Sequence, residues 1–69
     1  MSGSHFIVSQ RDHVWIYSNR GDEAGPFKTR EEAVEAAISE ATRLGDPNAE
    51  VIALDQDLQQ ETVWRYPDN

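Results

Sequence analysis

The stretch Phe27–Gly45, FKTREEAVEAAISEATRLG, decides the fold that we expect for this chain. Apolar residues recur within it at spacings of three and four, which places them on one face of an α-helix. These residues are Ala33, Val34, Ala37, Ile38, Ala41 and Leu44. The stretch therefore predicts a single amphipathic helix whose buried side is rich in alanine.

Both ends of this predicted helix are marked in the sequence. Thr29 fits the N-cap, and Glu32 completes a capping box in which each side chain accepts a hydrogen bond from an unpaired backbone N–H of the first turn. Arg43 lies near the other end, where the helix dipole favours positive charge. Gly45 can adopt the left-handed conformation that closes a helix, and Pro47 prevents its continuation.

Around the helix, runs of β-branched and aromatic residues predict four strands. The predicted strands are His5–Ser9, Val14–Ser18, Glu50–Leu54 and Glu61–Tyr66. The segment Asn19–Pro26 is dense in turn-forming residues and is expected to be a loop. The predicted fold class is therefore α+β, a four-stranded antiparallel sheet in ββαββ order with the helix packed on one face. Residues 5–67 would form the single domain, with a disordered N-terminus at 1–4 and a tail at 68–69.

Alternate residues of a strand point to opposite faces of its sheet, and here both faces are apolar. One set is aromatic: Trp15, Tyr17, Trp64 and Tyr66. The other set is aliphatic: Val14, Ile16, Ile52 and Leu54. One helix covers one face, and an uncovered apolar face usually marks an interface. We name the four aromatic residues as the possible interface, while the sequence leaves open which face the helix covers.

Dimerisation would bury the uncovered face. It would also add stability to a chain of 69 residues, which can bury only a small core. The alternative is that the loop Asn19–Pro26, or the C-terminal tail, folds over this face. The expected partner is thus a second copy or another protein.

Composition excludes several other classes of partner and site. Six Lys and Arg residues are scattered among thirteen Asp and Glu residues, so the formal net charge is −7. This charge opposes binding to nucleic acids and to anionic membranes. The chain has no cysteine, and we find no secretory signal and no apolar run long enough to span a bilayer, so a cytoplasmic location is expected.

No catalytic, cofactor-binding or metal site is predicted from the residues. The two histidines, His5 and His13, lack the spacing of metal ligands and are expected on the solvated surface. The segment Asp55–Asp57 resembles the start of a calcium loop but lacks its later glycine and glutamate, so an acidic turn is expected. The strand aromatics could stack on bases, but no lysines surround them, which favours packing. An enzyme would need a convergent set of polar residues, and none is visible.

The pattern of the whole chain resembles a family of small bacterial domains of unknown function. In that family an HVV-like strand precedes a W-x-V strand, a T-[KR]-x-E-A helix and two further strands. The matching segments are His5–Val8, Trp15–Tyr17 and Thr29–Ala33, with Val14 in the place of the usual glycine. The family has no established activity, so the resemblance implies no site residues. We expect a non-enzymatic domain that acts through protein–protein contacts, self-association included.

A second resemblance is to antitoxins with a partial RNase-H-like domain, in which a β-hairpin is followed by a capped T-x-E-E-A helix, as at Thr29–Ala33. It implies an acidic protein that masks a basic toxin. Such antitoxins usually carry a separate DNA-binding segment, for which this chain has no room. This reading is kept as the alternative function.

Overall fold

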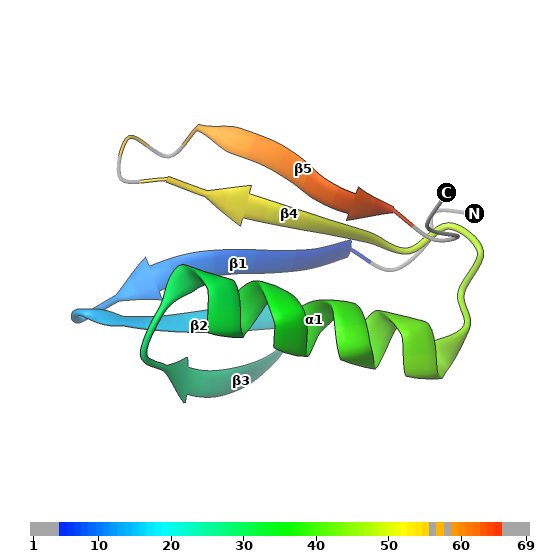
Figure 1. Cartoon of the computed structure of the whole chain (residues 1–69), viewed down its shortest axis with the longest axis horizontal. Coiled ribbons are helices and arrows are strands. Elements are labelled where there is room, and N and C mark those ends of the chain that lie inside the picture. The colour runs from blue at the N-terminus through cyan, green and yellow to red at the C-terminus, as the bar shows by residue number, and fades with distance from the viewer. Residues whose placement is uncertain (1–4, 56, 58, 66–69) are drawn as a thin grey trace.

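The computed structural model of this chain describes residues 5–55, 57 and 59–65. Its elements are β1 (His5–Arg11), β2 (Val14–Asn19), β3 (Asp22–Phe27), α1 (Arg30–Leu44), β4 (Glu50–Leu54) and β5 (Gln60–Arg65). The five strands form one sheet in the order β3-β2-β1-β4-β5, and α1 lies on one side of it (Figure 1). The predicted N-terminal disorder at 1–4 and the predicted tail at 68–69 lie outside the described residues.

The predicted fold class, a four-stranded antiparallel sheet in ββαββ order, is wrong. The sheet has five strands and is mixed, because β1 pairs antiparallel with β2 but parallel with β4. A helix joins β3 to β4, and a helical crossover brings the chain back to start the next strand in the same direction. Strand β4 therefore runs parallel to β1, and α1 passes over β2 and β1 on the way.

The additional strand, β3, lies in the segment that was predicted to be a loop. Asp, Gly and Pro are depleted in strands, which explains why DEAGPF was not recognised. Proline is tolerated on an edge strand, and β3 is an edge of this sheet. The residues between β2 and β3, Arg20 and Gly21, have φ values of 55° and 88°. Positive φ at both central residues is typical of two-residue hairpin turns, so this turn was the overlooked signal.

The helix begins and ends where its sequence indicates. Thr29 is the N-cap, and its hydroxyl oxygen accepts a hydrogen bond from the backbone N–H of Glu32 at 3.1 Å. The carboxylate of Glu32 accepts from the backbone N–H of Lys28 at 3.3 Å, one residue before the N-cap. Gly45 is left-handed, with φ 68°, and its N–H is shared between the carbonyls of Ala41 and Thr42.

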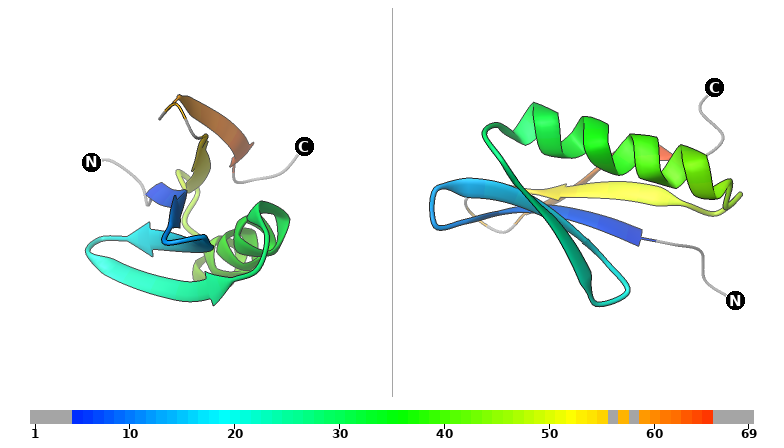
Figure 2. Two further views of the ribbon diagram at one scale, coloured as in Figure 1. Left: turned by 90° about the vertical axis from the view of Figure 1, so that its left-hand side faces the viewer. Right: turned by 90° about the horizontal axis from the view of Figure 1, so that it is seen from below.

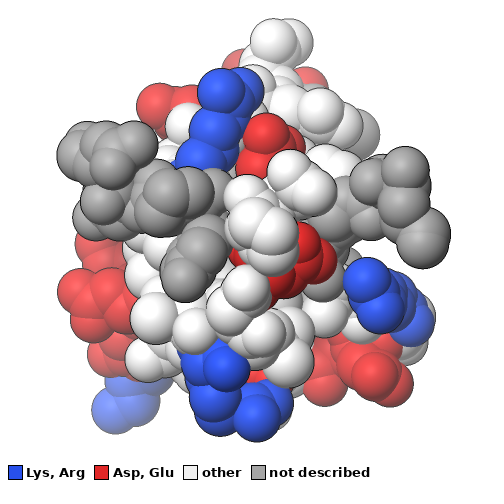
Figure 3. All heavy atoms as spheres, turned by 90° about the vertical axis from the view of Figure 1, so that its right-hand side faces the viewer, with Lys and Arg blue, Asp and Glu red and all other residues white. Residues whose placement is uncertain are grey.

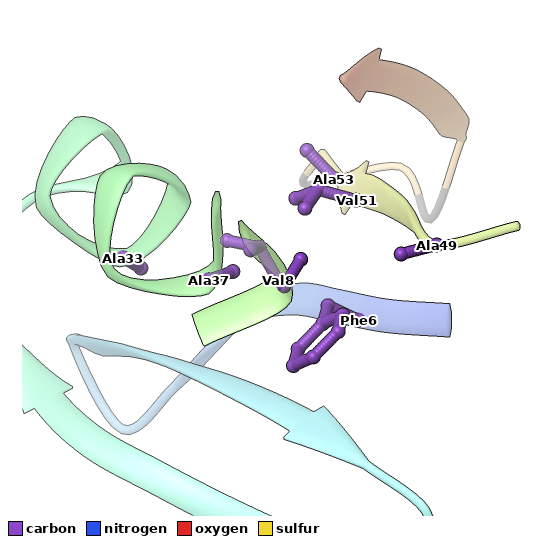
Figure 4. Close-up of a cluster of buried hydrophobic side chains, with 8 residues drawn as sticks. Phe6, Val8, Ala33, Ala37, Ala49, Val51 and Ala53 are labelled. Carbon is purple, nitrogen blue, oxygen red and sulfur yellow. The ribbon is translucent and has the colours of Figure 1, made fainter. Parts of the chain in front are cut away.

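Small residues on α1 let the helix lie close to the sheet. Ala33, Ala37 and Ala41 are fully buried, while Leu44, predicted on the same face, is 47% exposed. The sheet contributes the larger buried side chains, Phe6, Val8 and Val51, together with Ala49 and Ala53. Figure 4 shows these side chains gathered between the helix and strands β1 and β4.

Candidate functional site

The strand register shows which apolar residues lie on the side of the sheet away from α1. Ser9 lies opposite Ile16, and Ile7 is the parallel partner of Ile52. Residues in register share a face, and none of these belongs to the cluster packed against the helix. We call this surface the open face; its apolar residues are Ile7, Val14, Ile16, Ile52 and Leu54.

No described helix or strand lies over the open face. Both views of Figure 2 place α1 on one side of a strongly twisted sheet, and none of the other described elements lies over the opposite side. Ile7, Ile52 and Leu54 are half-buried by their neighbours within the sheet. Ile16 is only 9% exposed, because the irregular stretch of β3 approaches it. A Cβ atom at Gly25 would lie 3.0 Å from Ile16 Cγ2.

Charged side chains border the open face at both ends of β1. At one end both guanidinium nitrogens of Arg11 donate to the carboxylate of Glu23, at 3.0 and 2.8 Å. This hydrogen bonding and the negative charge of Glu23 raise the pKa of Arg11. At the other end, Glu50 lies 3.1 Å from Arg65 and 3.4 Å from His5. Arg11, Glu23, Glu50 and Arg65 form what we call the charged rim, and their formal charges cancel.

The structure places the predicted interface aromatics on the helix side of the sheet. Trp15, Tyr17 and Trp64 are half-buried and pack against the core beneath α1. The ring of Tyr17 lies 5.8 Å from that of Phe6 and stacks on that of Phe27 at 6.0 Å. Tyr66 lies outside the described residues. These positions do not test an interface role for the aromatics, but they make the aliphatic set the one that α1 leaves uncovered.

Segment 19–26, the other predicted cover of the open face, is not a loop folded across it. It is the β2–β3 turn and most of the edge strand β3. The pairing of β3 with β2 is irregular between Trp15 and Tyr17 of β2, and there β3 shields Ile16 alone among the open-face isoleucines. The contribution of β3 to the charged rim, Glu23, was missed with the strand itself.

A cavity of about 140 Å³ lies on the helix side, near the turn between β2 and β3. Its lining consists of Phe6, Tyr17, Asn19, Asp22, Glu23, Ala24 and Glu40. The polar groups are mainly acceptors, but Glu23 is already bound by Arg11 and Glu40 by Arg43. The bond from Arg43 lowers the pKa of Glu40, while burial raises the pKa of Tyr17. The cavity is thus small, and two of its three carboxylates already have cationic partners.

The described residues bring together no set of three histidine, aspartate or glutamate side chains that could hold a metal ion. His5 approaches Glu50 at the charged rim, and His13 lies in the turn between β1 and β2. Between β4 and β5, the Asp55 carboxylate accepts hydrogen bonds from the backbone N–H groups of Asp57 and Gln59. Those bonds are the side-chain-to-backbone contacts that hold an Asp turn.

Elsewhere on the described surface, acidic and basic side chains lie close to one another. Figure 3 views the end at which α1 finishes, and acidic and basic side chains of the described residues are interspersed there. The first turns of α1 carry exposed acid residues, among them Glu31 and Glu35. Arg30 of the same turn reaches Glu61 on β5 at 3.4 Å and so ties the helix to the far edge strand. Within the described part of the chain, α1 lacks the length and apolar character needed to cross a membrane.

Comparison with protein-family models, with curated proteins and with solved structures finds no match to this chain.

Proposed function

We propose that this chain is a small non-enzymatic domain that acts in the cytoplasm through protein–protein contacts, self-association included. One observation carries the proposal: the sheet has an apolar face over which no described element packs. A sheet layer ordinarily buries its apolar face against another layer, and α1 supplies that layer on one side only. The resemblance to small bacterial domains of unknown function is part of the same proposal.

The size of the core supports a role for association. The largest fully buried side chains are Phe6, Val8 and Val51, and the helix adds alanines to them. A core of this composition buries little apolar area, so a chain this short gains from a partner that binds the folded form.

Light scattering across a dilution series tests self-association. We expect the measured mass to rise from one chain toward two as the concentration reaches the high micromolar range. A mass of one chain throughout, with a folded circular dichroism spectrum, would contradict self-association.

The alternative function is that of an antitoxin-like acidic protein that masks a basic toxin. The observation that favours it is the position of the acid surplus: the charged rim is neutral, so the whole formal charge of −7 belongs to the rest of the chain. A basic partner would then dock on the acidic surfaces, such as the outer side of α1. Co-expression with a small basic protein encoded by the adjacent gene tests this function, and salt-sensitive co-purification is the expected result.

A further inference from the structure

We infer that the open face is the surface on which a second copy of this chain docks, sheet against sheet. The inference rests on the proposed self-association and adds the residues that make the contact. Ile7 and Ile52 lie at its centre as register partners on β1 and β4, and Leu54 extends it along β4. The arrangement, an apolar centre bordered by polar side chains, is that of protein interfaces in general.

Charge selects a second copy over a basic partner at this face. The charged rim consists of two separate ion pairs, one at each end of β1, and in each pair an arginine neutralises a glutamate. The rim therefore has no net formal charge. A neutral rim does not repel an identical surface, and it offers a basic protein no net attraction. The acid surplus lies outside the rim, so two copies docked by their open faces keep that surplus away from the contact.

The dimensions of the face are also of the right order. The molecule measures 32 × 23 × 21 Å, and Figure 1 looks down its shortest axis with the strands side by side across the view. Its two longer extents enclose about 700 Å², which is an upper bound on the area that one side of the twisted sheet can offer. A stable interface takes roughly 800 Å² of accessible surface from each partner. A complete sheet face is therefore of the order that an interface needs, whereas the exposed side chain of Leu44 on α1 is far smaller.

Two-fold symmetry makes such a contact self-complementary. In a two-fold dimer the same patch is used by both copies, so each open-face side chain meets the open face of the partner. Flat β-branched side chains such as Ile7 and Ile52 pack well between facing sheets, which lie about 10 Å apart.

The inference is tested with a variant in which the two central apolar side chains of the open face are replaced by residues that also favour strands. In the double variant Ile7→Thr with Ile52→Thr, both positions stay β-branched but lose apolar area. We expect its dimer dissociation constant, measured by sedimentation or light scattering, to rise roughly tenfold or more. The matched control is Leu44→Gln, which removes the most exposed large apolar side chain of the described residues, and its dissociation constant should equal that of the parent.

A second measurement uses the unchanged protein, so it does not depend on the folding of a variant. In a sample mixed from two isotope labellings, intermolecular nuclear Overhauser effects should connect the methyl groups of Ile7 and Ile52 to the open face of the other copy. Raising the salt concentration should leave the dissociation constant unchanged or lower it, because the rim is neutral and the two bodies carry like charge.

The outcomes separate this inference from the proposed function. A parent that dimerises while the Ile7→Thr, Ile52→Thr variant dimerises equally well overturns the open face as the interface and leaves self-association standing. Intermolecular contacts confined to α1 or to Trp64 have the same meaning. A parent that is monomeric at every concentration overturns both.

Discussion

At the scale of single residues, two positions control the backbone most directly. Thr29 satisfies an N–H of the first helical turn that would otherwise lack a partner. Gly25 has a φ of 140° and lies against the backbone of β2, where a Cβ atom would be 3.0 Å from the carbonyl oxygen of Trp15. The sequence alone identified the role of the first residue. The close approach at Gly25 involves a neighbouring strand and so depends on the fold.

Thr29→Ala should lower the free energy of unfolding by about 1 kcal/mol without changing the fold, because it removes the capping acceptor. Thr29→Ser keeps that acceptor and is the control, with an expected loss of a few tenths of that amount. Urea denaturation followed by circular dichroism measures both. A parental midpoint in the alanine variant would show that the cap contributes nothing.

Gly25→Ala should destabilise the protein by about 1–3 kcal/mol, since it combines a strained φ with a steric clash. Gly21→Ala is the matched comparison, because Gly21 also has a positive φ, of 88°, but has nothing within 4 Å of an added Cβ. We expect the melting temperature of Gly25→Ala to be lower than that of Gly21→Ala. Equal melting temperatures would rule out the clash.

At the scale of elements, the helix acts through its narrow alanine side, which allows aromatic residues of the sheet to fill the space beside it. Tyr17 of β2 is the main example, since it stacks on Phe27 and contacts Phe6. Its burial, helped by the negative charge of Glu40, raises its pKa above the ordinary value of 10.0. The sequence showed that Trp15 and Tyr17 share a face of the sheet. Which face α1 covers is determined by tertiary packing.

Tyr17 should make stability fall at alkaline pH. Its pKa is 10.0 when unfolded and higher when folded, so above pH 10.0 the unfolded chain releases a proton that the folded protein retains. The contribution of the Tyr17 hydroxyl to the free energy of unfolding is fully present below that pH, and it is lost as the pH rises toward the folded pKa. Tyr17→Phe keeps the ring and should lose less stability than the parent in this range. Parallel losses in denaturation curves taken on both sides of pH 10.0 would contradict the effect.

At the scale of the whole molecule, the arrangement of charge distinguishes the surfaces. The formal net charge is −7, yet the charged rim of the open face is balanced by its own ion pairs. A long-range field of this sign repels phosphate, whereas the contact that we propose at the open face depends on apolar area. The two properties favour protein partners over nucleic acids.

No measurable binding to DNA or RNA is expected at physiological salt, because affinity for phosphate requires clustered Lys and Arg. Fluorescence anisotropy with labelled single-stranded and double-stranded oligonucleotides measures this directly. Micromolar affinity that weakens steeply with added salt would overturn the expectation. It would also reassign the strand aromatics from packing to base stacking.

The sequence by itself determined the helix, its caps at Thr29 and Gly45, and the positions of four strands, because these depend on contacts between near neighbours. It also determined that the sheet would have two apolar faces, since alternation along a strand is local. Tertiary structure alone decided that Asp22–Phe27 becomes an edge strand and that β4 runs parallel to β1. Both depend on pairing between segments distant in the chain, where the hydrogen bonds of a partner strand outweigh weak strand propensity. The helical crossover likewise decided that α1 covers the aromatic face, and no described helix or strand covers Ile7 and Ile52 on the open face.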